Sequence, residues 1–93
     1  MPLFAISYDL QRPDFTYTDL FTALEQRGAR RVLQSTWALR GAYTVEALRD
    51  DLLPFIAEED RLFVTQVERW GACNALTSPR EIPEPASPPA SST

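Results

Sequence analysis

The chain has 93 residues, enough for one small domain, and its 13 acidic residues outnumber its 9 basic ones, giving a net charge of -4. That charge repels phosphate backbones at long range and counts against a simple nucleic-acid binder. The absence of histidine removes the usual Ser-His and Cys-His nucleophilic schemes, so any catalysis would have to use carboxylates.

The single cysteine, Cys73, allows neither an internal disulfide nor a cysteine zinc cluster, which fits a reducing compartment. No N-terminal run resembles a signal peptide, and no apolar run approaches membrane-spanning length. We therefore expect a soluble, cytoplasmic protein without a membrane partner.

The first predicted element is a strand over residues 3–9, Leu-Phe-Ala-Ile-Ser-Tyr-Asp. Its density of apolar and aromatic side chains is typical of a strand in the middle of a sheet, covered on both faces. Gln11, Arg12 and Pro13 should end the strand soon after Asp9. The Asp9 carboxylate would then lie at the C-terminal end of the strand, where α/β sheets usually build their sites.

A helix is predicted over about residues 17–27. Thr16-Tyr-Thr-Asp19 has the form of a capping box at its start, and Gly28 supplies a left-handed stop. An apolar stripe at helical spacing should pack on the sheet and consists of Tyr17, Leu20, Phe21 and Leu24.

Residues 32–39 alternate in the manner of a second strand region, but no Asn-Gly or Gly-Gly turn divides them. Three arrangements stay open. The region bends at Gln34-Ser35, it forms one long strand, or Gly41 folds it back over Ala42 and Tyr43 as a very short partner strand.

Thr44 is the predicted N-cap of a second helix, and Pro54 should end its regular part near Leu53. Residues 62–67 predict a further strand, and residues 70–76 a final strand or a docking arm. From Ser78 onward the chain is rich in proline and serine, which predicts a disordered tail. We expect a folded domain over residues 1–77 and a tail over residues 78–93.

Several of these features together resemble the small CRISPR-associated subunit that bridges integrase dimers during spacer acquisition, and its uncharacterised stand-alone relatives. Virulence-associated protein D toxins are a more distant match. The resemblance covers about residues 2–76 and rests on Tyr8-Asp9 at a strand end, Gly28 after a helix, Arg31-Val-Leu-Gln-Ser-Thr-Trp37, the capped second helix and Asp60-Arg-Leu-Phe-Val.

The resemblance implies an α+β fold of the ferredoxin-like βαββαβ type, an antiparallel sheet with two helices on one face, and a homodimer formed through the sheets. It also implies a role in antiviral defence. In nuclease members of the family, paired aspartates at the end of the first strand bind a divalent ion for phosphodiester cleavage, and Asp9 matches that aspartate. Ser35-Thr36-Trp37 matches the family's serine followed two residues later by an aromatic.

One Asp9 per chain is too few for a magnesium site, but a two-fold axis past the strand end would pair it with its symmetry mate. Asp9 is thus the candidate catalytic and Mg²⁺-binding residue of an endonuclease acting on RNA or DNA. Candidate nucleic-acid contacts are Arg12, Arg31, Arg40 and Ser35. Trp37 and Trp70 are candidates for the dimer interface, with the core as the other place for Trp37.

A second interpretation belongs to a different class of function. Several members of the family are described as structural. In that case the chain is a catalytically silent dimeric scaffold that presents sheet edges or residues 70–76 to a partner protein.

Overall fold

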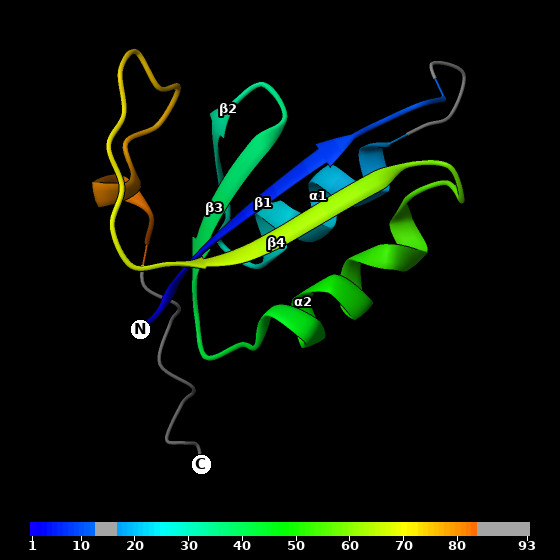
Figure 1. Ribbon diagram of the computed structural model, residues 1–93, viewed down its shortest axis with the longest axis horizontal. Coiled ribbons are helices and arrows are strands. Elements are labelled where there is room, and N and C mark those ends of the chain that lie inside the picture. Colours follow the sequence, from blue (N-terminus) through cyan, green and yellow to red (C-terminus); the bar gives the residue numbers. More distant parts are fainter. Residues whose placement is uncertain (13–16, 84–93) are drawn as a thin grey trace.

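The computed structural model describes residues 1–12 and 17–83. Its centre is strand β1 (Leu3–Asp9), which pairs antiparallel with β3 (Thr36–Arg40) on one side and with β4 (Arg61–Val67) on the other (Figure 1). Strand β2 (Arg30–Leu33) pairs with β3 and completes the sheet order β2-β3-β1-β4. The predicted central strand, ending at Asp9, is confirmed.

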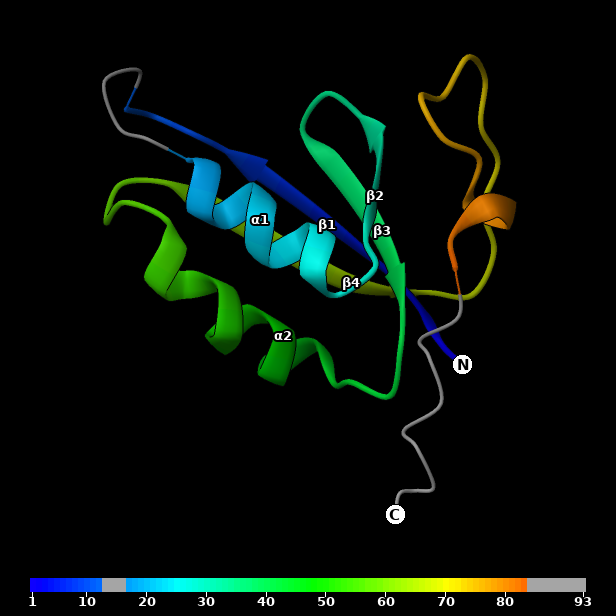
Figure 2. The same cartoon turned by 180° about the vertical axis from the view of Figure 1, so that it is seen from behind.

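Two helices, α1 (Thr18–Gln26) and α2 (Val45–Leu52), lie on the same side of the sheet (Figure 2). Helix α1 follows the predicted pattern, with Leu20 and Leu24 fully buried, and it ends before Gly28, whose φ of 82° is left-handed. Tyr17 occupies the N-cap and makes no side-chain capping bond. The expected cap, Thr16, lies outside the described residues.

Helix α2 begins as predicted. The Thr44 hydroxyl oxygen accepts a hydrogen bond from the Ala47 backbone N–H at 3.1 Å. Pro54 lies in a 3₁₀ turn over Leu53–Phe55 directly after the helix, because proline cannot donate the next helical hydrogen bond.

The middle of the chain forms a hairpin that bends at Gln34 and Ser35, the first of the three open arrangements. The pairing of β2 with β3 shifts register between Arg31 and Leu33, which marks a bulge. The Ser35 carbonyl accepts a hydrogen bond from the Tyr8 backbone N–H at 3.2 Å, so the turn is fastened to the end of β1.

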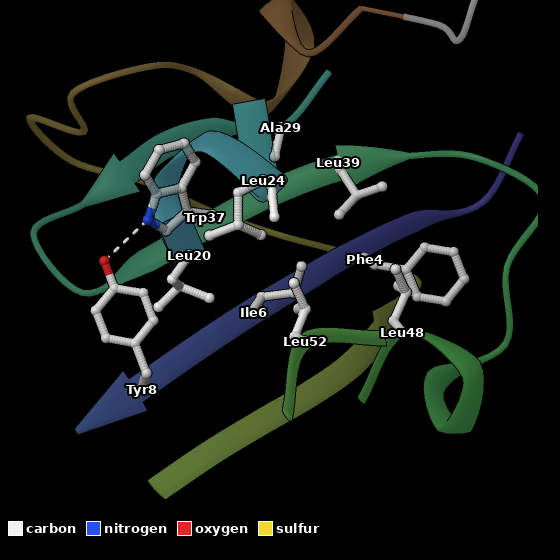
Figure 3. Packing of buried hydrophobic residues seen from close by; sticks show 11 residues of the cluster. Phe4, Ile6, Tyr8, Leu20, Leu24, Ala29, Trp37, Leu39, Leu48 and Leu52 are labelled. Atoms are coloured by element: carbon white, nitrogen blue, oxygen red, sulfur yellow. Dashed lines mark hydrogen bonds between the residues drawn. The ribbon is translucent and has the colours of Figure 1, made fainter. Parts of the chain in front are cut away.

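The main core lies between the sheet and the helices (Figure 3). Alternate side chains of β1 enter it, because successive side chains of a strand point to opposite faces. The largest fully buried side chains are Phe4, Ile6, Leu20, Leu24, Leu39, Leu48 and Leu52. Each contributes roughly 1.5–3 kcal/mol by leaving water.

The opposite face of the sheet is covered at one end only, by the segment that follows β4 (yellow to orange in Figure 1). Ile82, 3% exposed, packs there against Leu3 and Ala38. The Leu76 backbone N–H donates to the Val32 carbonyl at 2.9 Å. Residues 70–76, all of them described, form no strand, and the segment docks against the sheet instead.

The predicted tail differs from the structure over residues 78–83. Ser78 caps a 3₁₀ turn over Pro79–Glu81 through a capping box, and Ile82 is buried. Composition alone indicated a polar, unpacked run. In the structure, two apolar residues of this stretch, Pro79 and Ile82, are buried. Residues 84–93 lie outside the described part of the chain.

Around Ser7, Thr36 and Phe63, no described residue covers this face of the sheet; we call this area the uncovered face. The Ser7 and Thr36 hydroxyls lie 2.9 Å apart in a hydrogen bond, and the Phe63 side chain is 65% exposed. No helix among the described residues is long and apolar enough to cross a lipid bilayer.

Candidate functional site

Asp9 lies at the C-terminal end of β1, as predicted, and its side chain is 67% exposed. It is in register with Arg61 of β4, and an Arg61 terminal nitrogen lies 3.9 Å from an Asp9 carboxylate oxygen. An ion pair this exposed contributes little to stability. The carboxylate is therefore open to solvent and to a ligand.

Two open hollows meet at Asp9. The helix-side hollow, of about 430 Å³, is lined by Tyr8, Asp9, Leu10, Gln11, Phe21, Arg31, Gln34 and Ser35. The open-side hollow, of about 300 Å³, belongs to the uncovered face and is lined by Ser7, Tyr8, Asp9, Ser35, Arg61, Leu62 and Phe63. The end of β1 and the turn between β2 and β3 thus separate the two spaces.

Arg31 is held on the helix side by aromatic rings. Its guanidinium carbon lies 4.7 Å from the ring centre of Phe21 and 4.8 Å from that of Trp37, and these two rings stack at 6.0 Å. Such cation–π contacts fix the orientation of a long side chain. The sequence placed Arg31 next to a strand but carried no signal for the two rings.

Trp37 is 4% exposed and belongs to the core of the chain itself, the other role that the sequence left for it. Its indole N–H donates to the Tyr8 hydroxyl oxygen at 2.9 Å (Figure 3). Trp70 is 41% exposed, and the Arg80 guanidinium lies 6.0 Å from its ring centre. The interface role of Trp70 stays a prediction.

The other predicted arginines lie apart from this site. Arg40 is in register with Leu3, six residues along β1 from Asp9 and roughly 20 Å away at about 3.3 Å per residue. Its terminal nitrogen donates to the Pro79 carbonyl at 3.4 Å. Arg12 forms an ion pair with Glu59 at 3.7 Å. The structure therefore gathers Asp9, Arg31 and Ser35, and neither Arg12 nor Arg40 lines either hollow.

Asp60 organises the loops beside the site. Its carboxylate accepts hydrogen bonds from the Gln11 backbone N–H at 2.7 Å, the Ala57 backbone N–H at 2.7 Å, and the Tyr17 hydroxyl at 2.7 and 2.9 Å. It thereby joins the exit of β1, the start of α1 and the loop before β4. The acidic run Glu58-Glu59-Asp60 was visible in the sequence, but nothing distinguished which carboxylate would turn inward.

The hydrogen bonds between Asp60 and its neighbours contribute to shifted pKa values of both Asp60 and Tyr17. Partial desolvation raises the pKa of Asp60, but the hydrogen bonds that its charged form accepts outweigh this effect, and the pKa is held below its usual value. Desolvation and the bond to Asp60 raise the pKa of the Tyr17 hydroxyl.

The residues around Asp9 in one chain supply few ligands for a metal ion. Magnesium is usually held by one or two carboxylates together with waters and substrate phosphates. Among residues 1–12 and 17–83, no group of three or more Asp, Glu, His or Cys side chains is placed to hold a metal ion. Asp9 supplies a single carboxylate, already beside Arg61, so a second copy would have to supply the other.

No protein-family model matches the chain, and no solved structure is significantly similar to it. The family resemblance therefore stays a prediction drawn from short motifs.

Proposed function

We propose that the chain is a homodimeric, ferredoxin-like module related to the small CRISPR adaptation subunit. The strand order β2-β3-β1-β4, with both helices on one side of an antiparallel sheet, supports the ferredoxin-like assignment. The observation that carries the dimer is Phe63, a large aromatic side chain that is 65% exposed within a seven-residue strand. Aromatic side chains are enriched at protein–protein interfaces, and Phe63 lies on the uncovered face.

A second copy of the chain is the occupant that we propose for the uncovered face. A two-fold interface places the same patch of each protomer against the other. Phe63 is in register with Ser7, and Asp9 with Arg61 two positions further along. A two-fold axis near Phe63 would therefore bring the two Asp9 carboxylates toward each other.

The paired Asp9 carboxylates are the proposed magnesium ligands of an endonuclease acting on RNA or DNA. The metal, when bound with substrate phosphates, would neutralise charge and activate water. The chain's own part is to leave Asp9 accessible, at 67% exposure, and to supply Arg61 for phosphate contact beside it.

One observation favours a second function, a catalytically silent dimeric scaffold. Arg61 already faces Asp9 across the two strands, so the pair can serve simply as an opposite-charge pair of neighbouring strands. The net charge of -4 also opposes nucleic-acid binding. In this function the dimer offers its outer strands to a partner protein.

The dimer is tested by measuring molar mass in solution with light scattering and sedimentation. The wild type should be a dimer, and Phe63→Asp a folded monomer, because a charge cannot be buried unpaired at an interface. Leu53→Asp is the matched control, since Leu53 is also exposed, at 46%, but lies in the turn after α2. A monomeric wild type, or a dimeric Phe63→Asp, would refute the proposal.

The chemistry is tested by incubating labelled single-stranded RNA and duplex DNA with wild type, Asp9→Asn and the exposed-surface control Asp51→Asn, with and without magnesium. Magnesium-dependent cleavage that Asp9→Asn abolishes and Asp51→Asn retains supports the endonuclease. If no cleavage occurs, or if Asp9→Asn cleaves as the wild type does, Asp9 leaves the catalytic list and the scaffold function takes its place.

A further inference from the structure

The cation of Arg31 is held in place by aromatic rings, and no described residue neutralises it. It forms no ion pair with any acidic side chain in residues 1–12 and 17–83. Two aromatic rings and the Tyr8 hydroxyl oxygen, 3.4 Å from a terminal nitrogen of Arg31, are its neighbours. A guanidinium partly removed from water gains from an anionic partner more than an exposed one does.

Two donors at this position have no acceptor within residues 1–12 and 17–83. The Tyr8 hydroxyl oxygen accepts from the Trp37 indole at 2.9 Å and from Arg31 at 3.4 Å, and no described residue accepts its own proton. The Nε–H of Arg31 is buried against the rings, also without an acceptor among the described residues. Buried donors without partners are rare and destabilising. The local deficit is thus in acceptors and in negative charge.

The helix-side hollow is lined by both Arg31 and Tyr8. Its volume of about 430 Å³ falls within the range of roughly 300–1,000 Å³ found for small-molecule sites. Besides Arg31 and Tyr8, its lining includes two polar residues of the hairpin turn, Gln34 and Ser35. Donors from the sheet and from the turn suit an anion whose oxygens point in several directions, as those of a phosphate do, better than a planar carboxylate.

We propose that the helix-side hollow is a phosphate-binding site contained within one chain, with Arg31 and Tyr8 as its main ligand-contacting residues. The hollow is larger than a phosphate ion, so the phosphate belongs to a larger molecule, either a mononucleotide or the phosphorylated end of a nucleic-acid strand. The site needs neither the dimer nor metal chemistry, because it faces the helices whereas the dimer is proposed through the uncovered face.

The charge of Asp9 gives the proposed phosphate site a distinctive test. Asp9 belongs to the lining of the same hollow, and its negative charge opposes an anion there even with Arg61 3.9 Å away. Asp9→Asn should therefore tighten phosphate binding in the absence of metal. The proposed endonuclease predicts loss of cleavage for the same variant, so the two proposals fail or succeed separately.

The two tryptophans provide a local readout. The Trp37 indole N–H bonds the Tyr8 hydroxyl, so its NMR signal should move when a phosphate binds beside Tyr8. Trp70, on the segment after β4, serves as the internal control. Titrations use inorganic phosphate, acetate, adenosine 5′-monophosphate and a 5′-phosphorylated oligonucleotide, without metal, and calorimetry gives the affinities.

Saturable movement of the Trp37 signal with phosphate, stronger than with acetate, is expected. Arg31→Gln should weaken phosphate binding about tenfold or more, since it removes the cation, and Tyr8→Phe about fivefold, since it removes one hydroxyl donor to a charged group. Arg30→Gln, which changes the exposed neighbouring arginine, should bind as the wild type does. The nucleotide and oligonucleotide arms identify which molecule carries the phosphate.

The proposal is overturned if the Trp37 signal does not respond to phosphate up to about 20 mM, a concentration that would nearly saturate a site with a dissociation constant of ~1 mM. It is equally overturned if acetate binds as tightly as phosphate, or if Tyr8→Phe and Arg31→Gln bind like Arg30→Gln. Tyr8→Phe keeps the buried ring, so that variant decides the matter should Arg31→Gln fail to fold.

Discussion

The indole N–H of Trp37 donates to the Tyr8 hydroxyl oxygen at 2.9 Å, which joins β3 to β1 inside the helix-covered face of the sheet (Figure 3). The two residues are 29 positions apart in sequence. Their hydrogen bond orders the end of β1 on its buried side, whereas Asp9, the next residue, is exposed. The buried and the accessible sides of the candidate site therefore rest on adjacent residues of one strand.

Trp37→Phe should lower the free energy of unfolding by about 1–3 kcal/mol, because it removes the indole N–H donor and part of a buried ring while keeping an aromatic neighbour for Phe21. Urea denaturation followed by circular dichroism measures the effect. Trp70→Phe, at a site 41% exposed, should change stability by less than about 0.5 kcal/mol. Equal effects of the two substitutions would contradict the structural role of Trp37.

Asp60→Ala should lower the free energy of unfolding at neutral pH by about 1–2 kcal/mol, because the carboxylate accepts bonds from Gln11, Ala57 and Tyr17 and is partly exposed to solvent. The pKa of Asp60 is lower in the folded than in the unfolded protein, so its contribution is complete above the unfolded pKa near 3.8. The contribution is lost as the pH falls further, through the folded pKa.

Unfolding of wild type and Asp60→Ala should therefore be compared by urea denaturation at pH 7 and at about pH 2.5, where the difference between them should shrink. Asp50→Ala is the control, since the exposed Asp50 carboxylate bonds its neighbour Arg49 instead. A difference for Asp60→Ala that is the same at both pH values would rule out the charged carboxylate as its cause.

Gly28→Ala should destabilise the protein by about 1 kcal/mol. The cost arises from the backbone, because φ at Gly28 is 82° and a side chain there is strained, although an added Cβ would meet Pro83 only at an ordinary 3.8 Å. Gly71→Ala is the matched control, since no atom lies within 4 Å of its Cβ position. Thermal and urea unfolding should separate the two variants, and a neutral Gly28→Ala would argue against the left-handed helix stop.

Ile82→Ala should cost about 2–4 kcal/mol, as expected of a well-buried isoleucine that packs on Leu3 and Ala38. Leu76→Ala, on the same segment but 67% exposed, should cost far less. Limited proteolysis gives a second measurement, because loosening Ile82 should expose the segment after β4 to cleavage. Similar stability and protease resistance for both variants would show that the segment does not hold the sheet.

Features that depend on nearby residues could be predicted from the sequence. The end of β1 at Asp9, the Thr44 cap and the stop at Pro54 follow from local chemistry and are confirmed. The bend at Gln34 and Ser35 could not be chosen, because neither residue is specific to a hairpin turn and the turn is fastened by a distant backbone donor, Tyr8.

The burial of Ile82 was missed for the same reason. Proline and serine around it indicate disorder, and only the apolar side chains of Leu3 and Ala38, far away in sequence, make its packing favourable. At the candidate site, the position of Asp9 could be predicted, but the acceptor deficit at Tyr8 and Arg31 could not. It exists only where β1, β2, β3 and α1 meet. The dimer and the metal stay predictions.

The two edge strands of the sheet differ in how readily a strand of another molecule could pair with them. Strand β2 is four residues long and carries a bulge, features that discourage the addition of another strand. Strand β4 has seven residues, rich in β-branched and aromatic side chains, and within the described residues its outer backbone edge pairs with no strand. Arg61 begins this stretch and Arg69 lies two residues after it, the flanking positions at which natural sequences place charged residues that limit aggregation. Conditions that screen charge, such as high salt, should thus bring on self-association along β4 first.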